Sequence, residues 1–242
     1  MKISTLRLAF LTLAMAVSAG LSAQFVTERE IKDDDAYVED QEMNIVVLDN
    51  ETHEHLENDV IIRGYDARKI KVFEDVTDTV IPIKNYRLYT VSCIREGYMY
   101  YNEKFWPDEK KVHFQKVNLK KLEIGLKTDI RDIYFKGNET AVYHKSKPAI
   151  DELIEWMNVN ETVKIRVIGH ANGPNNEWPQ RVYNKASKER AEVVVEYMID
   201  NGIDKSRLEF IGAGNTEMIY EDPQTNWENE ANRRVEIEVI GL

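Results

Sequence analysis

Most of the candidate functional side chains lie between Gly169 and Arg190. His170 follows an apolar run, and Asn172 and Trp178 lie in the polar connection after it. His170 could act as a general base, but that role needs a nucleophile or a carboxylate partner. The sequence has no Gly-x-Ser-x-Gly, cysteine partner or His-Glu-x-x-His pattern to supply one. We therefore interpret His170 as a structural residue and predict that the protein is not an enzyme.

Two other sets of residues could bind a metal. His53 and His55 are two residues apart, but no third ligand lies near them in the sequence, which favours a solvated turn over a metal site. Cys93 is the single cysteine, which excludes an intramolecular disulfide and a cysteine-based zinc site. Its strand-like surroundings, TVSCIREGY, indicate a small buried apolar residue. We predict no metal site and no cofactor.

The first residues predict export. Lys2 and Arg7 precede an apolar run and a small-residue ending at Ala23, which together are typical of a signal peptide over residues 1–23. The alternative is a retained membrane anchor, for which the apolar run is short. No later stretch is apolar enough to span a bilayer as a helix, so we expect no transmembrane segment in the mature chain. The formal net charge of −11 argues against nucleic acid as a partner.

The predicted secondary structure divides the rest of the chain into a β part and a mixed α/β part, after a short leader. Residues 24–42 are acidic and poor in apolar residues, which indicates a flexible leader. Residues 43–127 contain short runs rich in β-branched and aromatic residues between turn residues, which predicts an all-β sandwich. The runs are MNIVVLD, DVIIRGYD, TVIPI, YRLYTVSCI, GYMYYNEKF and VHFQKVNL.

Residues 128–242 change to a mixed pattern. We expect a strand in DIRDIYF, a helix in SKPAIDELIEWMNVN, a strand in TVKIRVIG and a helix in ASKERAEVVVEYMIDNG that ends at Asn201-Gly202. Strands in RLEFIGAG and NRRVEIEVI, separated by a short helix, complete the chain. The whole is therefore an α+β protein, with an N-terminal sandwich followed by a βαβαβ(α)β two-layer α/β sandwich.

The order of several short pieces in residues 129–242 resembles the OmpA-like C-terminal domain. Tyr134-Phe135 fits the end of that family's first strand. The other pieces are Ile168-Gly169-His170, Tyr183-Asn184, Ser187-Lys188-Glu189-Arg190-Ala191, Asn201-Gly202-Ile203, Ser206-Arg207-Leu208, Gly212-Ala213-Gly214-Asn215 and Asn232-Arg233-Arg234-Val235-Glu236. The preceding segment is similar to carboxypeptidase-regulatory-like sandwich domains, through DNETHEHLENDVIIRGYD and YTVSCIREGYMYYNEKF.

The OmpA-like resemblance implies non-covalent binding of peptidoglycan through the diaminopimelate residue of its stem peptide. In this family an arginine of the second helix takes the carboxylate and a loop aspartate takes the ammonium, and the arginine corresponds to Arg190. Asn184 matches the family's asparagine at the start of that helix, where it can also act as an N-cap. Asn232 and Arg233 or Arg234 match the closing motif, and only one of the two arginines can face the pocket.

The sequence departs from the family at the loop that reads the ammonium. The usual Gly-His-Thr-Asp is Gly-His-Ala-Asn here, so Asn172 replaces the aspartate, and Lys136 replaces an acidic residue after the first strand. A neutral acceptor in place of a charged one costs on the order of 1–2 kcal/mol. The connection to the helix is also longer than usual. Glu177 could supply the missing charge there, or Trp178 could close over the ligand.

The predicted function is that of an exported periplasmic protein, associated with the outer membrane, that binds peptidoglycan and links it to an envelope partner recognised by the sandwich. The alternative is a degenerate OmpA-like domain without wall binding, which acts as a protein-interaction module. The sequence does not identify the stem peptide or the partner.

Overall fold

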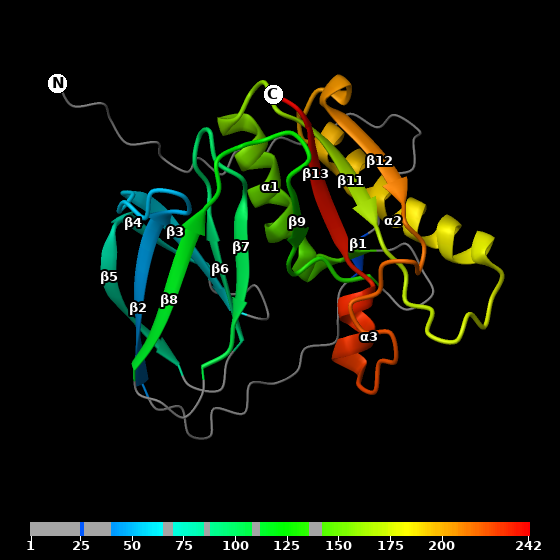
Figure 1. Cartoon of the computed structure of the whole chain (residues 1–242), viewed down its shortest axis with the longest axis horizontal. Helices are drawn as coiled ribbons and strands as arrows, with labels where there is room; N and C mark the ends of the chain where they lie inside the picture. Colours follow the sequence, from blue (N-terminus) through cyan, green and yellow to red (C-terminus); the bar gives the residue numbers. More distant parts are fainter. Residues whose placement is uncertain (1–24, 27–39, 65–69, 85–87, 108–111, 136–141) are drawn as a thin grey trace.

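The computed structural model describes residues 25–26, 40–64, 70–84, 88–107, 112–135 and 142–242. The predicted signal peptide, most of the acidic leader and Lys136 lie outside the described residues. Figure 1 shows two parts side by side, a β-sandwich and a four-stranded sheet covered by helices on one face. The structure therefore has the predicted fold class. No helix in the described part of the chain is both long and apolar enough to span a bilayer.

The sandwich consists of a three-stranded and a four-stranded sheet. Side chains alternate along its strands, so that Met43, Ile45 and Val47 are fully buried between the sheets. Cys93 is buried in the same core, as expected of a small apolar residue. The three-stranded sheet has the order β5 (Asp78–Lys84), β2 (Asp40–Asp49), β8 (Val112–Leu119), and the four-stranded sheet the order β4 (Ile70–Val76), β3 (Asn58–Gly64), β6 (Tyr89–Cys93), β7 (Tyr101–Phe105).

Two features of the sandwich differ from the sequence prediction. Strand β2 begins at Asp40, inside the segment that we expect to be a flexible leader. Strand β4 has no counterpart among the predicted runs, because it is an edge strand whose pattern is interrupted by Asp75 at a positive φ of 53°. His53 and His55 are exposed, and His53 lies in the turn after β2.

The second part has the predicted two layers. Its sheet has the order β12-β11-β13-β9, with β11 parallel to β12 and antiparallel to β13, and helices α1 and α2 pack on one face. The elements are β9 (Lys127–Ile130), α1 (Lys147–Val159), β11 (Lys164–Gly169), α2 (Gln180–Asp200), β12 (Leu208–Gly212), α3 (Asn226–Asn232) and β13 (Val235–Gly241). Short pieces β1 (Phe25–Val26), β10 (Val142–Tyr143), η1 (His144–Ser146) and η2 (Lys205–Arg207) complete the description.

The helix patterns are confirmed, but some boundaries are wrong. Ile150, Leu153 and Met157 are fully buried on α1, and Gly202 has the left-handed φ of 100° expected after α2. The strand predicted from 129 to 135 instead runs from 127 to 130, because a turn with Asp132 at φ 66° ends it. Helix α2 starts six residues before the predicted segment, since its first three residues are exposed and show no apolar periodicity.

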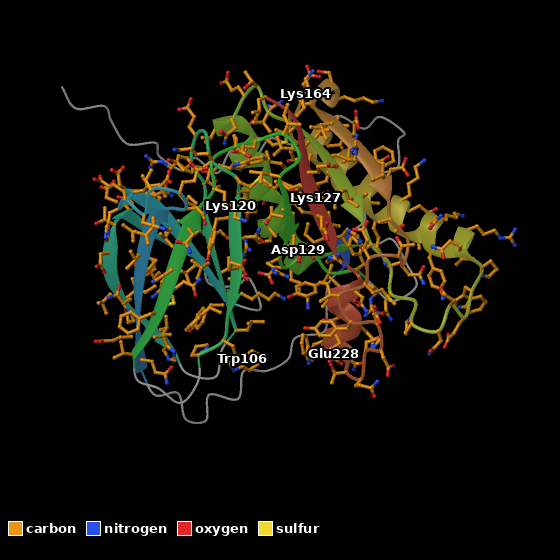
Figure 2. The ribbon with its side chains drawn as sticks, viewed as in Figure 1. Trp106, Lys120, Lys127, Asp129, Lys164 and Glu228 are labelled. Carbon is orange, nitrogen blue, oxygen red and sulfur yellow. The ribbon has the colours of Figure 1, made fainter. Side chains whose placement is uncertain are left out.

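The two parts have separate hydrophobic cores but are in direct contact, because Met99 and Tyr100 of the sandwich pack into the core of the second part. The indole Nε1 of Trp156 on α1 donates to the Tyr98 carbonyl at 2.8 Å, and the Gly97 N–H donates to the Asn160 side chain at 2.8 Å. Figure 2 shows Lys127 and Asp129 on β9, next to the sandwich. The parts are thus joined by direct packing.

A buried ionic cluster reinforces this junction. Arg63 of β3 is 1% exposed and pairs with Glu152 of α1 and with Asp132 at 3.3 Å. The Tyr100 hydroxyl donates to Glu152 at 2.8 Å, and Thr90 donates to Asp132. Burial raises the pKa of Glu152, while the Arg63 charge acts in the opposite direction. A buried ion pair of this kind is costly to break on one side, so it fixes how the two parts sit together.

Candidate ligand-binding site

The site is built where β11 ends and α2 crosses it. Gly169 is the last residue of β11, and a Cβ there would lie 1.9 Å from the Ser187 carbonyl oxygen. A Cβ on Gly212, at the end of the neighbouring strand β12, would lie 2.4 Å from the Lys188 nitrogen. Glycine at these two strand ends therefore allows α2 to approach the sheet closely, which brings Arg190 underneath the loop that begins at His170.

Arg190 is a buried cation. Its side chain is 4% exposed, its Nη1 donates to the His170 carbonyl at 3.0 Å, and its guanidinium carbon lies 5.3 Å from the centre of the Phe135 ring. The Nε atom is buried and has no hydrogen-bond partner among the described residues. The guanidinium is thus held in place on one side, with donor capacity left over on the other.

The electrostatic surroundings of Arg190 are positive. Burial first, and the neighbouring charge of Arg233 second, lower the pKa of Arg190 from 12.5 to about 10. Burial also lowers the pKa of the half-buried Arg233, which the charge of exposed Glu230 partly offsets. Within the described ranges neither guanidinium forms an ion pair with a carboxylate. A buried cation without a counter-ion is unfavourable in the free protein and would be neutralised by an anionic ligand.

Asn172 lies at the rim of this site and is held at both ends. Its Nδ2 donates to Asn229 Oδ1 at 2.7 Å, and its Oδ1 accepts from Asn232 Nδ2 at 2.8 Å. Asn232 is fully buried and also bonds to the backbone N–H and carbonyl of Tyr220. The loop after β11 is therefore tied to α3 through a row of neutral amides.

Of the two candidate arginines at the start of β13, Arg233 is the one beside Arg190. Arg234 bonds instead to Asp129 at 3.1 Å, to Glu236 at 2.8 Å and to the Glu217 carbonyl at 3.0 Å. The carboxylates of Asp129 and Glu236 thus neutralise the charge of Arg234. The structure thus brings Asn172, Arg190, Asn232 and Arg233 into one neighbourhood and leaves Arg234 outside it.

Asn184 lies away from this neighbourhood. It is exposed on α2, its Oδ1 accepts from Gln180 at 3.1 Å, and it faces Gly214, where a Cβ would lie 2.3 Å from that oxygen. The expected N-cap role is wrong, because α2 begins at Gln180 with Pro179 in the N-cap position and no side-chain cap.

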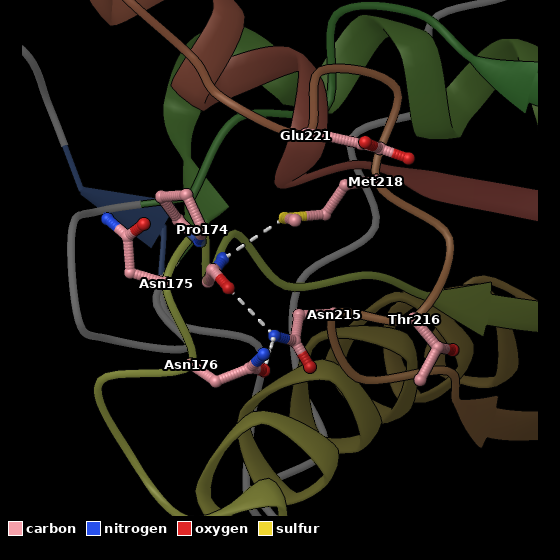
Figure 3. Close-up of a pocket in the computed structure, with 8 residues that line it drawn as sticks. Pro174, Asn175, Asn176, Asn215, Thr216, Met218 and Glu221 are labelled. Atoms are coloured by element: carbon pink, nitrogen blue, oxygen red, sulfur yellow. Dashed lines mark hydrogen bonds between the residues drawn. The ribbon is translucent and has the colours of Figure 1, made fainter.

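The long connection before α2 folds away from Arg190. Glu177 and Trp178 are exposed, Trp178 by 61%, and the Trp178 N–H donates to the Tyr183 hydroxyl at 3.1 Å. The described contacts join neither Glu177 nor Trp178 to Arg190. A polar cavity of about 330 Å³ opens on this side, and neither Asn172 nor Arg190 lines it. Figure 3 shows Asn215 bonding across it to Asn176 at 2.9 Å and to the Gly173 carbonyl at 2.8 Å.

His170 has a structural environment. It is 1% exposed, and its Nε2 lies 3.4 Å from Glu236 Oε1. Ligand atoms of His170, Glu217 and Glu236 lie within 4.8 Å of one another, close enough for a metal ion. Arg234 already pairs with Glu236 there, however, and would repel a cation. Although burial raises the pKa of Glu236, contact with His170 and the charge of Arg234 lower it to about 2.

Sequence reasoning missed two contributors to the site. Phe135 packs against the Arg190 guanidinium, and its role has no local signal because the two are far apart in the chain. Asn229 bonds to Asn172, and its spacing of three residues from Asn232 places both amides on one face of α3. That spacing is a signal that the sequence does contain.

Comparisons with known proteins identify the C-terminal part. The model of the OmpA family matches residues 134–233, which therefore form an OmpA-family domain. No curated protein matches the chain. The similar solved structures include the periplasmic domain of Helicobacter pylori MotB, which is 20% identical, with 50% of this chain and 79% of that chain covered and a TM-score of 0.42.

Two further similar structures each cover just under half of the chain. The peptidoglycan-associated lipoprotein from Burkholderia pseudomallei is 13% identical over 46% of this chain and 88% of that chain, with a TM-score of 0.39. The cell wall anchor of the T6SS from Pseudomonas aeruginosa is 18% identical over 48% of this chain and 80% of that chain, with a TM-score of 0.38.

Proposed function

We propose that the protein is a non-enzymatic, exported envelope protein whose OmpA-family domain binds peptidoglycan in the periplasm. Arg190 takes a carboxylate of the stem peptide, which we propose to be of the diaminopimelate type, and Arg233 adds a second positive charge. The single observation that carries this proposal is the buried Arg190 guanidinium. Its Nε has no hydrogen-bond partner, and no carboxylate of the described residues forms an ion pair with it. A bidentate pair with a ligand carboxylate would satisfy it.

The sandwich over residues 43–127 is, in this proposal, a carboxypeptidase-regulatory-like adaptor that recognises an outer-membrane or other envelope partner. Because Arg63 and Trp156 join it rigidly to the wall-binding domain, a partner on the sandwich would be held at a fixed position relative to the wall.

A second candidate function is that of a protein-interaction module without wall binding. It is favoured because the site around Arg190 is closed to solvent. Arg190 is 4% exposed, and the Asn172 amide is bonded at both ends. This candidate predicts that the site never opens to a wall ligand.

Co-sedimentation with purified peptidoglycan sacculi separates the two. We expect the mature protein to sediment with sacculi and Arg190→Met to remain in the supernatant. Arg181→Met, which removes an exposed charge from the same helix, is the matched control and should sediment like the unmodified protein. Failure of the unmodified protein to sediment would leave the interaction module as the function.

A further inference from the structure

We infer that the site around Arg190 recognises a carboxylate whose neighbouring amine is acylated, and that it discriminates against the free zwitterion. This inference rests on the proposed binding of peptidoglycan and narrows the class of stem peptide that is bound. In chemical terms, the preferred ligand is a stem peptide whose side-chain amine forms an amide, as it does in a cross-link to a neighbouring stem.

The guanidinium groups of Arg190 and Arg233 supply the positive charge of the site. The Arg190 guanidinium is buried, with one hydrogen bond to the His170 carbonyl and an unbonded Nε. Burial and then the charge of Arg233 lower the pKa of Arg190, and burial lowers the pKa of Arg233. Two guanidinium groups can hold one or two carboxylates through charge-assisted hydrogen bonds. The same pair repels an ammonium group placed beside that carboxylate.

The described residues offer no free carboxylate to pair with the ammonium of a ligand. Asp129 and Glu236 are engaged by Arg234, and Glu230 is exposed and acts on Arg233 only from a distance. The position best placed to accept from an ammonium is Asn172, which carries no charge. Among the described residues, the ammonium of a free zwitterion would therefore have no carboxylate partner.

The hydrogen bonds of Asn172 strengthen this selectivity. Its carbonyl oxygen already accepts from Asn232, and its Nδ2 already donates to Asn229. An ammonium group has three donors that need acceptors, whereas an acylated amine has one N–H and brings its own carbonyl acceptor. With one hydrogen bond already accepted, Asn172 Oδ1 can offer an ammonium at most one more, uncharged, acceptor site, which leaves two of the three ammonium donors unmatched.

The test compares untreated sacculi with sacculi whose free amines are acetylated by an N-hydroxysuccinimide ester. The probe proteins are the unmodified chain and Asn172→Asp, which restores a carboxylate at the rim. We expect the unmodified protein to bind acetylated sacculi roughly threefold to tenfold more tightly than untreated ones, because a repulsion is removed. Asn172→Asp should show the reverse order, provided its melting temperature shows that it is folded.

Weaker binding of the unmodified protein to acetylated sacculi would overturn the inference while leaving peptidoglycan binding in place. Equal binding of the unmodified protein to both kinds of sacculi would also overturn it. Binding to neither would instead refute the proposed function itself, and with it the inference. The comparison with the unmodified protein alone decides the matter if Asn172→Asp does not fold.

Discussion

Replacing Arg190 by methionine should make the free protein more stable while abolishing ligand binding. Burial and Arg233 lower the pKa of Arg190 from 12.5 to about 10. At ~1.4 kcal/mol per pH unit, holding this charge in the folded state costs roughly 3 kcal/mol. Because the folded pKa is below the unfolded one, the cost is fully present below pH 10 and fades only as the pH rises towards 12.5.

The gain on substitution is smaller than that cost. The variant loses the hydrogen bond to the His170 carbonyl, which with the buried acceptor left unbonded is worth about 1–2 kcal/mol. Methionine keeps contact with the Phe135 ring through its sulfur, so the packing term changes little. A net stabilisation of about 1 kcal/mol follows, or a rise in Tm of roughly 2–4 °C.

Urea and thermal unfolding near pH 7.5, followed by circular dichroism, measure this difference. Arg181→Met on the same helix is the control and should change the free energy of unfolding by less than about 0.5 kcal/mol, because Arg181 is exposed. Destabilisation of Arg190→Met by more than about 2 kcal/mol would show that Arg190 is a satisfied structural residue and would refute the reasoning.

The remaining predictions concern the scaffold. Arg63→Met should lower the free energy of unfolding by roughly 3–5 kcal/mol in urea, because Asp132 and Glu152 would stay buried without their cation, and a loss below about 1 kcal/mol would contradict this. Gly169→Ala should cost at least about 3 kcal/mol, since its Cβ would meet the α2 backbone, and an unchanged Tm would show that α2 can shift freely. Glu236→Gln should flatten the pH dependence of stability: a carboxylate with a folded pKa of about 2 adds stability above its unfolded pKa, and this stability is lost as the pH falls from the unfolded pKa to the folded one. A pH profile unchanged by the substitution would contradict that assignment.

The α/β part of the fold can be predicted well from the sequence, because the signals for its helices and strands are local. The buried face of α1 and the left-handed Gly202 follow from spacing and from one residue type. The boundaries that failed lack such signals. The first three residues of α2 are exposed, and strand β4 is an edge strand with a positive φ at Asp75, so neither segment shows a hydrophobic period.

The site could be predicted only in part, because residue type does not reveal contacts over long sequence distances. Arg190 is predicted from the resemblance to the OmpA-like domain, but its burial against Phe135 depends on how α2 crosses the sheet. The choice between Arg233 and Arg234 depends on Asp129, which lies more than a hundred residues earlier and binds Arg234. The junction formed by Arg63 likewise cannot be predicted from either half of the sequence alone, because its partners Asp132 and Glu152 lie in the other half.

Ligand-induced thermal stabilisation tests the central claim most directly, because it compares Arg190 in the free and the bound protein. A ligand that binds only the folded state raises Tm, and above its Kd the rise grows with the logarithm of the ligand concentration. Soluble stem-peptide fragments released from sacculi should raise the Tm of the unmodified protein in this concentration-dependent way and leave that of Arg190→Met unchanged. An equal rise in both proteins, or none in either, would contradict the assignment of Arg190 as the residue that binds the peptidoglycan carboxylate.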